Sequence, residues 1–169
     1  MISYEKILWN ASEKKDIDAI NDYSYVIKKN HEYPQAFMER GIRYMKIKNY
    51  NKAYLDFSET LKLNNLSEEL RKKAFLYRGI SNIFLKKPNL NSKELQIMHD
   101  EFLITEIYDS KERRYLLGLI FSVNEKYNSA IKYFKSIILE DSGFFKNNND
   151  FYNFLPLEAK LLLKSELNI

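Results

Sequence analysis

Side chains capable of acid–base, nucleophilic or metal chemistry are few and scattered in this sequence of 169 residues. The two histidines, His31 and His99, lack the His-x-x-x-His or His-Glu-x-x-His spacing that places two imidazoles around a metal ion. Asp100 and Glu101 follow His99, but neighbours along a helix point about 100° apart and do not converge on one substrate. The sequence has no cysteine, which excludes thiolate nucleophiles, disulfides and thiolate-ligated zinc.

Other patterns of catalysis are missing as well. There is no nucleophile elbow, Walker loop or dinucleotide-binding glycine motif, and four isolated glycines cannot build a phosphate cradle. Acidic pairs fall near the ends of expected helices, where solvation or the helix dipole accounts for them. These pairs are Asp16/Asp18, Glu68/Glu69 and Glu140/Asp141. We therefore predict a protein that is not an enzyme and that uses no metal or cofactor.

The charge pattern does not favour a nucleic-acid partner. Lysine and arginine number 27 against 23 acidic residues, and the net charge of +4 is spread thinly along the chain. Short basic pairs such as Lys14-Lys15 and Lys28-Lys29 have acidic neighbours and do not reach the cluster of about five to eight that signals phosphate binding. We interpret them as solvated helix faces.

Location is predicted from what the sequence lacks. No apolar segment approaches the roughly 18 residues needed to cross a bilayer. The first 15 residues mix charges into apolar positions, so we expect no secretory signal. With no cysteine, a reducing compartment is compatible. The expectation is a soluble cytoplasmic protein without membrane contact.

Glycine recurs inside segments of helical pattern. Gly41, Gly79 and Gly118 are 38 and 39 residues apart, and two of them directly follow an arginine. Because a helical glycine costs about 1 kcal/mol relative to alanine, a recurring one indicates that another helix packs closely against it. The spacing predicts an internal repeat built from helices.

The residues after Gly41 and Gly118 follow one shared pattern, at i, i+4, i+7 and i+8, which is the stripe of an amphipathic helix, and the same pattern occurs 34 residues before the first of them. Three copies are Ala53, Phe57, Thr60 and Leu61; Ala130, Phe134, Ile137 and Ile138; and Ala19, Tyr23, Val26 and Ile27. Short polar breaks at residues 46–51 and 124–128 separate the helices and predict antiparallel neighbours.

The pattern resembles the tetratricopeptide repeat (TPR), a helix-turn-helix unit with the signature aromatic-x-x-Leu-Gly-x-x-Tyr, then Ala-x-x-x-Phe and a closing proline. Residues 34–67 match best, and residues 111–144 match next. Residues 1–33 match in the second helix only, whereas residues 72–110 match in the first helix, with Met98 and Phe102 the expected counterparts in the second. In the best copy the matching residues are Phe37, Gly41, Tyr44, Tyr50, Ala53 and Phe57, with Arg40 in the leucine position and Asn65 in the proline position.

The resemblance implies an all-α fold, an α-solenoid of antiparallel helix pairs with a C-terminal capping helix. We predict a single domain over residues 1–169, with repeats at about 1–33, 34–67, 72–110 and 111–144. The tail and capping helix occupy residues 145–169, and the helix is expected to begin near Pro156 with apolar residues at 157, 161, 162, 163 and 167. An alternative places the tail in a groove or in a partner. Trp9, the sole tryptophan, is expected in the core of the first repeat.

In this family the first helix of each pair lines a concave groove, so the resemblance implies a binding surface there. The predicted lining is apolar throughout: Tyr4, Leu8, Met38, Ile42, Met45, Leu76, Ile80, Ile83, Tyr115 and Leu119. Within it, Leu8, Ile42, Ile80 and Leu119 are in register and predict an exposed aliphatic strip. The predicted polar rim comprises Gln35, Glu39, Arg43 and Lys46. Family members that grip a peptide's terminal carboxylate carry Lys and Asn on the inner positions, and this sequence departs from them.

Three functions follow as hypotheses. The first is a non-catalytic adaptor that binds a partner helix or apolar protein segment in the groove. The second is a small inhibitor or immunity-type protein that blocks a toxin or enzyme with its loops and edge. The third is a helical repeat that binds RNA. Three alternatives to a partner-binding groove explain the apolar strip equally well when taken together. The strip is packed core, it is covered by the tail helix, or it is a site of self-association.

Overall fold

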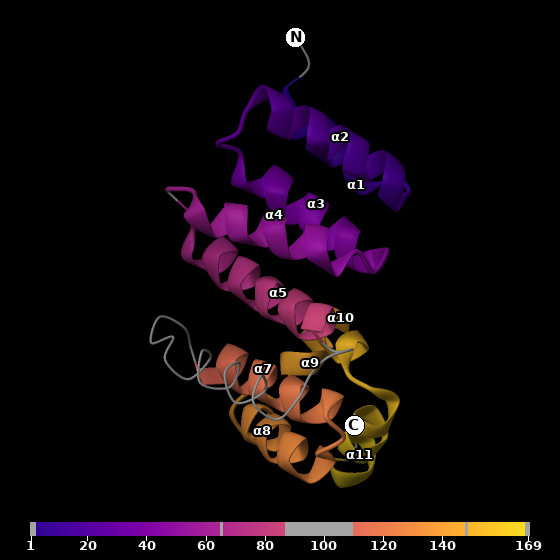
Figure 1. The fold of residues 1–169 in the computed structure, drawn as a ribbon. Coiled ribbons are helices and arrows are strands. Elements are labelled where there is room, and N and C mark those ends of the chain that lie inside the picture. Colours follow the sequence, from indigo (N-terminus) through magenta and orange to yellow (C-terminus); the bar gives the residue numbers. More distant parts are fainter. Residues whose placement is uncertain (1–2, 65, 87–109, 148, 168–169) are drawn as a thin grey trace. The chain divides into compact units, whose positions relative to one another are not determined.

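The computed structural model describes residues 3–64, 66–86, 110–147 and 149–167, and over these residues the protein is all-α, without a strand (Figure 1). The chain divides into two compact units, Met1–Lys86 and Lys87–Ile169. We describe each unit by itself, and the single domain over 1–169 stays a prediction. The expected second helix of the third repeat, with Met98, His99 and Phe102, lies outside the described residues.

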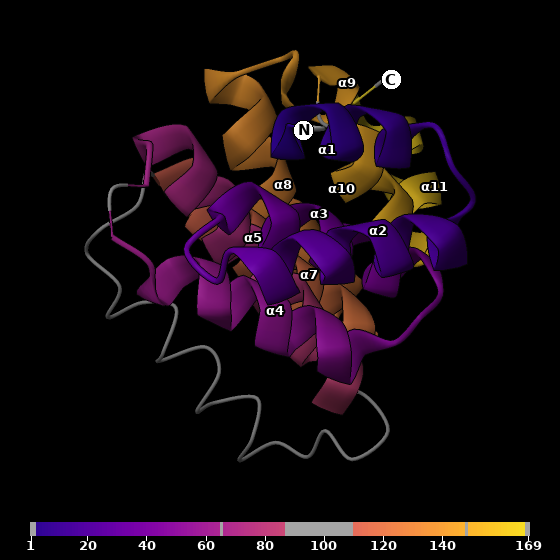
Figure 2. The same cartoon turned by 90° about the horizontal axis from the view of Figure 1, so that it is seen from above.

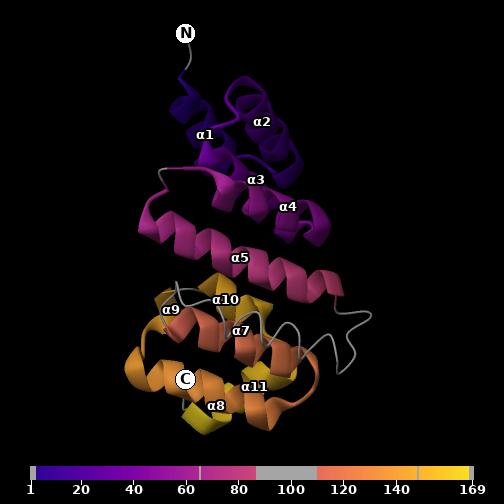
Figure 3. The ribbon, with the colours of Figure 1, turned by 60° about the vertical axis from the view of Figure 1, so that its left-hand side comes forward.

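Unit 1 is a succession of helices in which each packs against the next (Figures 1 and 3). Residues 1–33 and 34–67, the first two predicted repeats, each contain two of these helices. The helices are α1 (Tyr4–Ser12), α2 (Asp16–Lys29), α3 (Pro34–Lys46), α4 (Tyr50–Lys62) and α5 (Glu68–Lys86).

Local signals explain where several of these helices begin. The Ser3 side chain accepts a hydrogen bond from the Lys6 amide before α1, and the Asn49 side chain accepts one from the Lys52 amide before α4, each at 3.3 Å. Both are N-caps that satisfy an amide left without a partner in the helix. Pro34 occupies the first turn of α3, where its missing N–H costs nothing.

The core of unit 1 is formed by the apolar faces that the repeat pattern marks. One cluster joins Val26 and Ile27 of α2 to Ala36 and Phe37 of α3, and the partly buried Tyr4, Ile7 and Leu8 of α1 pack against it. A second cluster holds Ala11, Ala19 and Tyr23. Helix pairs of this length are stable only when such faces are covered by a neighbour.

Unit 2 contains α7 (Ser110–Val123), α8 (Tyr127–Glu140), α9 (Phe144–Asn147), α10 (Asn149–Phe154) and α11 (Leu157–Leu167). Helix α8 packs against both α7 and α11, and α9 packs against α10. The Tyr115 ring of α7 lies 6.2–6.3 Å from the rings of Phe134, Phe144 and Phe145. Aromatic packing therefore ties the start of the predicted tail to the last predicted repeat.

Helix α11 begins immediately after Pro156, as expected, and it buries Leu163 of the predicted apolar positions but not all of them. Ala159 and Leu163 are buried with Leu155, at a spacing of four residues. Leu157 and Leu161, which belong to the predicted apolar face, are 65% and 57% exposed. Burial of those two leucines is thus not observed, because α11 packs through the side that carries Ala159 and Leu163.

The two best-matching repeats share a close contact between a helical glycine and a phenylalanine. A Cβ atom placed on Gly41 would lie 2.6 Å from Cε1 of Phe57, and one placed on Gly118 would lie closer still to the same atom of Phe134. Distances below 3.0 Å are not tolerated by real Cβ atoms. Glycine is therefore required at these two positions, where the aromatic ring of the second helix rests on the first.

The turns after these first helices are also alike. Lys48 and Glu125 have positive φ angles of 60° and 62°, the left-handed conformation common after a helix. In the turn after α3, the Lys48 amide donates to the Met45 carbonyl and the Asn49 amide donates to the Tyr44 carbonyl. In the turn after α7, the Glu125 amide donates to the Ser122 carbonyl and the Lys126 amide donates to the Phe121 carbonyl. The sequence repeat is thus a repeat of backbone geometry.

No helix over the described ranges combines the length and the apolar character that crossing a bilayer requires.

Candidate functional site

The predicted groove lining is mostly buried. Seven of its ten residues, Met38, Met45, Leu76, Ile80, Ile83, Tyr115 and Leu119, have almost no exposed surface, and Tyr4, Leu8 and Ile42 are partly buried. Tyr115 and Leu119 belong to unit 2 and the other eight belong to unit 1. The expectation of an exposed aliphatic strip is therefore corrected, because these side chains are taken up by helix packing.

The four predicted rim residues have different environments. Gln35 and Lys46 are exposed, and Glu39 is partly buried. Arg43, by contrast, keeps only 12% of its side chain exposed and is engaged within unit 1. Its guanidinium is thus a structural group, and of the rim only Gln35 and Lys46 remain open to a partner.

Arg43 joins two turns of the chain. From α3, its Nη2 donates to the Ser12 carbonyl at 2.7 Å, and its Nη1 contacts Oδ1 of Asp16 at 3.0 Å and the Lys14 carbonyl at 3.4 Å. The Ser12 carbonyl belongs to the last turn of α1, where carbonyls lack helical partners. One side chain therefore holds the α1–α2 turn beside the end of α3.

The Tyr23 hydroxyl is buried next to this anchor. It makes no hydrogen bond of ordinary geometry over the described residues, and it faces Arg43 and Glu39. Burial raises the pKa of the Tyr23 phenol, Glu39 raises it further, and Arg43 opposes both. A phenol with a raised pKa stays neutral at physiological pH, so Tyr23 is no candidate base.

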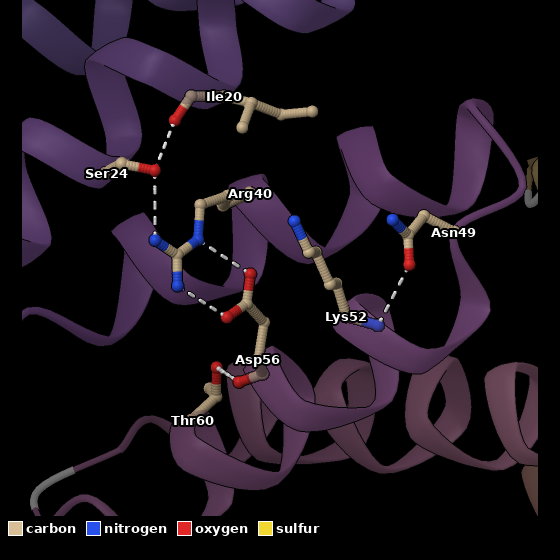
Figure 4. A network of polar contacts seen from close by, with 7 residues as sticks. All are labelled: Ile20, Ser24, Arg40, Asn49, Lys52, Asp56 and Thr60. Atoms are coloured by element: carbon tan, nitrogen blue, oxygen red, sulfur yellow. Dashed lines mark hydrogen bonds and ion pairs between the residues drawn. The ribbon is translucent and has the colours of Figure 1, made fainter.

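A second buried network links α2, α3 and α4 (Figure 4). Arg40 donates from Nε and Nη2 to the two Asp56 oxygens at 2.8 and 2.7 Å, and from Nη1 to the Ser24 hydroxyl at 3.0 Å. Asp56 is 4% exposed. Burial raises the pKa of the Asp56 carboxyl above its ordinary value, although Arg40 works in the opposite direction. The Nε, Nη1 and Nη2 groups of Arg40 all donate to protein atoms, so the network is structural.

Sequence reasoning missed this pair, although a signal was present. Arg40 occupies the leucine position of the repeat signature, and Asp56 lies beside Phe57 within the apolar stripe of α4. A charged residue at a buried helix position requires a residue of opposite charge at the position that faces it on the neighbouring helix. Two such anomalies in helices predicted to pair indicate an ion pair between them.

Exposed lysines lie in the α1–α2 turn, which Arg43 contacts, and in the α3–α4 turn, which follows Arg43 in sequence. We call this surface the turn edge and define it as Lys14 and Lys15 of the α1–α2 turn with Lys46, Ile47 and Lys48 of the α3–α4 turn. All five are exposed, Ile47 to 43%. Lys14 is paired with Asp22 at 2.6 Å, whereas the other three lysines have no ion-pair partner in the described part of the chain. Against these four lysines stands the exposed Glu13, directly before Lys14, so the two turns together carry more positive than negative charge.

A pocket of about 480 Å³ lies where the α2–α3 and α4–α5 connections approach one another. Its lining comprises Glu32, Tyr33, Pro34, Gln35, Lys62, Leu63 and Asn64. Lys62 is already paired with Glu59 at 2.6 Å, and burial followed by the Glu5 charge raises the pKa of Tyr33. The lining offers no converging pair of acid and base, so the pocket does not support a catalytic role.

No group of three or more His, Asp or Glu side chains within the described ranges is placed to hold a metal ion. Of the two histidines, His31 is exposed in the connection before α3, and His99 is outside the described residues.

Comparisons with protein-family models, curated proteins and solved structures found no match. The resemblance to TPR proteins is a matter of the motif residues within this sequence.

Proposed function

We propose that this protein is a TPR-like α-solenoid of antiparallel helix pairs, closed at its C-terminal end by α11. The support is internal. Gly41 with Phe57 and Gly118 with Phe134 make the same contact, and the following turns share one conformation. The packing of α11 against α8 is what a capping helix needs.

Within that fold, we propose a non-catalytic cytoplasmic protein that binds another protein through the turn edge. The observation that carries this proposal is the exposed Ile47 between the exposed Lys46 and Lys48, just after the Arg43 side chain that contacts the α1–α2 turn with Lys15. Arg43 holds the α1–α2 turn and backbone hydrogen bonds hold the α3–α4 turn, so the surface costs little conformational entropy to organise on binding. A segment with carboxylates around one apolar side chain complements it in charge and in shape.

The turn edge also gives weight to the second candidate, an inhibitor or immunity-type protein, because such a protein acts through loops and edges. The adaptor and the inhibitor differ in the fate of the bound protein. A partner that keeps its activity in the complex indicates an adaptor, and one that loses it indicates an inhibitor. A gene for a toxin beside the gene for this chain would favour inhibition.

The proposal is tested by affinity purification from the native cell with three forms of the chain, followed by mass spectrometry. Wild type is compared with Lys46→Glu/Lys48→Glu and with Lys132→Glu/Lys164→Glu, an equal charge change at exposed positions of unit 2. We expect a protein that co-purifies with wild type and with the unit 2 variant but is lost from the turn-edge variant. Equal recovery with all three forms would contradict the proposal.

RNA binding makes a different prediction for the same surface. Neutralisation of phosphates by lysine releases counterions, so affinity for RNA falls steeply with salt concentration. Titration of wild type with single-stranded RNA at several salt concentrations separates the two. We expect no binding with that steep dependence, and finding it would favour RNA as the ligand of the turn edge.

A further inference from the structure

Helix α1 is attached to unit 1 by few buried side chains. Of its nine residues, all of them described, only Ala11 is buried, whereas α2 and α3 bury five residues each. Trp9, the largest side chain of α1, is 73% exposed, contrary to its predicted place in the core. Helices α1 and α2 form one end of unit 1 (Figures 1 and 2). A helix as short as α1 is not stable by itself, so it depends on this limited packing.

Helix α1 also lacks the close contact that joins the helices of the best-matching repeat. The Phe57 ring rests on Gly41, at a position where a Cβ atom would clash with it. Ile7 lies 34 positions before Gly41 and Tyr23 lies 34 positions before Phe57, so the first repeat has a branched side chain in place of the glycine. Tyr23 packs with Ala11 instead. The contact that fixes α3 on α4 is therefore not made between α1 and α2.

The two ends of α1 are held in different ways. At the C-terminal end, the Ser12 carbonyl accepts a hydrogen bond from Arg43 at 2.7 Å, and Arg43 also contacts Asp16 at 3.0 Å. At the N-terminal end, the Tyr4 ring packs edge-on against Tyr33, with the ring centroids 6.1 Å apart. The α1–α2 turn is thus the fixed point about which the rest of α1 can move.

An apolar site lies beneath α1. Its members are Val26 and Ile27 of α2 with Ala36 and Phe37 of α3, and we call them the α2–α3 cluster. Three partly buried side chains of α1 pack against this cluster: Tyr4, Ile7 and Leu8. With Ala11 they occupy positions i, i+3, i+4 and i+7, the pattern by which an amphipathic helix sits in an apolar groove. Helix α1 therefore shows what kind of ligand the α2–α3 cluster accepts.

We propose that α1 is a displaceable cover. It swings out about the α1–α2 turn, and an amphipathic helix of a partner protein, apolar at i, i+3, i+4 and i+7, takes its place on the α2–α3 cluster. Because α1 and the partner helix compete for one site, the affinity for the partner is reduced by the fraction of chains in which α1 is closed. This site is separate from the turn edge, and neither proposal depends on the other.

Hydrogen exchange on the full chain tests the opening of α1. We expect the amides of residues 8–12 to exchange at least about tenfold faster than the hydrogen-bonded amides of α2 and α3, since weakly packed helices open without global unfolding. Leu8→Ala removes packing against the α2–α3 cluster and should increase exchange in α1 further. Trp9→Ala, on the exposed side of the same helix, is the matched control and should not.

Competition for the site is tested with a synthetic peptide of residues 3–14 that carries a fluorophore, titrated with the full chain and followed by anisotropy. Leu8→Ala should act in opposite directions in the two molecules. In the chain it weakens the cover and should strengthen capture of the wild-type peptide by about threefold to tenfold, whereas in the peptide it should weaken capture by a similar factor. Trp9→Ala should change capture in neither molecule.

Exchange of α1, α2 and α3 at one common rate would overturn the proposal. So would a peptide that does not bind the Leu8→Ala chain, or a Leu8→Ala substitution that acts in the same direction in chain and peptide. Peptide capture that is blocked by dimer formation, seen in sedimentation velocity, would assign the site to α1 of a second copy and overturn the assignment to a partner protein.

Discussion

Arg40 and Asp56 form a pair whose energetic balance is set by burial. Each charge loses hydration between helices, and the two hydrogen bonds at 2.7 and 2.8 Å offset that loss. Burial lowers the pKa of Arg40, and Asp56 raises it. The net effect is an increase in the pKa, so Arg40 remains charged. The pair therefore contributes more to the alignment of α3 with α4 than to net stability.

This balance predicts different outcomes for breaking the pair and for replacing it. Asp56→Ala leaves a buried guanidinium without its partner and should lower the free energy of unfolding by about 3 kcal/mol or more. Arg40→Met/Asp56→Leu fills the same space with apolar groups and should cost far less. Urea unfolding followed by circular dichroism measures both. A double variant as unstable as Asp56→Ala would show that the ion pair itself supplies the stability.

The glycine contact gives a second prediction at the level of residues. Gly41→Ala places a Cβ 2.6 Å from Phe57 and should reduce the free energy of unfolding by about 1–3 kcal/mol through overpacking. Adding Phe57→Leu to Gly41→Ala should relieve part of that loss. Gly143→Ala is the control, since its nearest atom is the movable end of Asn147, and it should change stability by less than about 0.5 kcal/mol.

At the level of elements, α11 is positioned by its small residue. Ala159 and Leu163 are fully or almost fully buried, whereas Leu161, two positions before Leu163, is largely exposed. Leu163→Ala should therefore destabilise the protein by about 2–4 kcal/mol, and Leu161→Ala should be nearly neutral. Thermal unfolding of the two variants decides between the observed face and the face expected from the sequence. Equal destabilisation would show that α11 is oriented differently.

Arg43 is a polar link between α3 and the α1–α2 turn. Arg43→Gln cannot reach the Ser12 carbonyl and Asp16 together, so the α1–α2 turn should open more often. Hydrogen exchange should increase at residues 12–16 and in α1. Lys46→Gln, one turn further along α3 and exposed, is the matched control and should leave exchange there unchanged. No difference between the two variants would contradict the anchoring role.

The whole molecule consists of two units with different charge. Residues 1–86 carry 16 lysines and arginines against 11 acidic residues, whereas residues 87–169 carry 11 against 12. The net positive charge thus belongs to unit 1, where the turn edge lies. Long-range attraction of an acidic partner is accordingly expected to favour unit 1.

The division into units predicts separate responses to equivalent substitutions. Gly41→Ala should raise hydrogen exchange mainly within α1 to α5, and Gly118→Ala mainly within α7, α8 and α11. The two substitutions introduce the same clash, so their magnitudes are comparable. If each variant destabilised both units equally, the chain would unfold as the single domain predicted from its sequence.

The sequence alone determined the helical class, the glycine and aromatic positions of the repeat, and the start of α11, because these follow from local periodicity and backbone sterics. It indicated apolar faces without determining whether each would be covered. Only the tertiary structure decided that Met38 and Ile80 are buried, that Trp9 is exposed, that Arg40 finds Asp56 and that Arg43 joins two turns. Burial and ion pairing depend on which helix lies across the interface, and residues distant in sequence supply that neighbour.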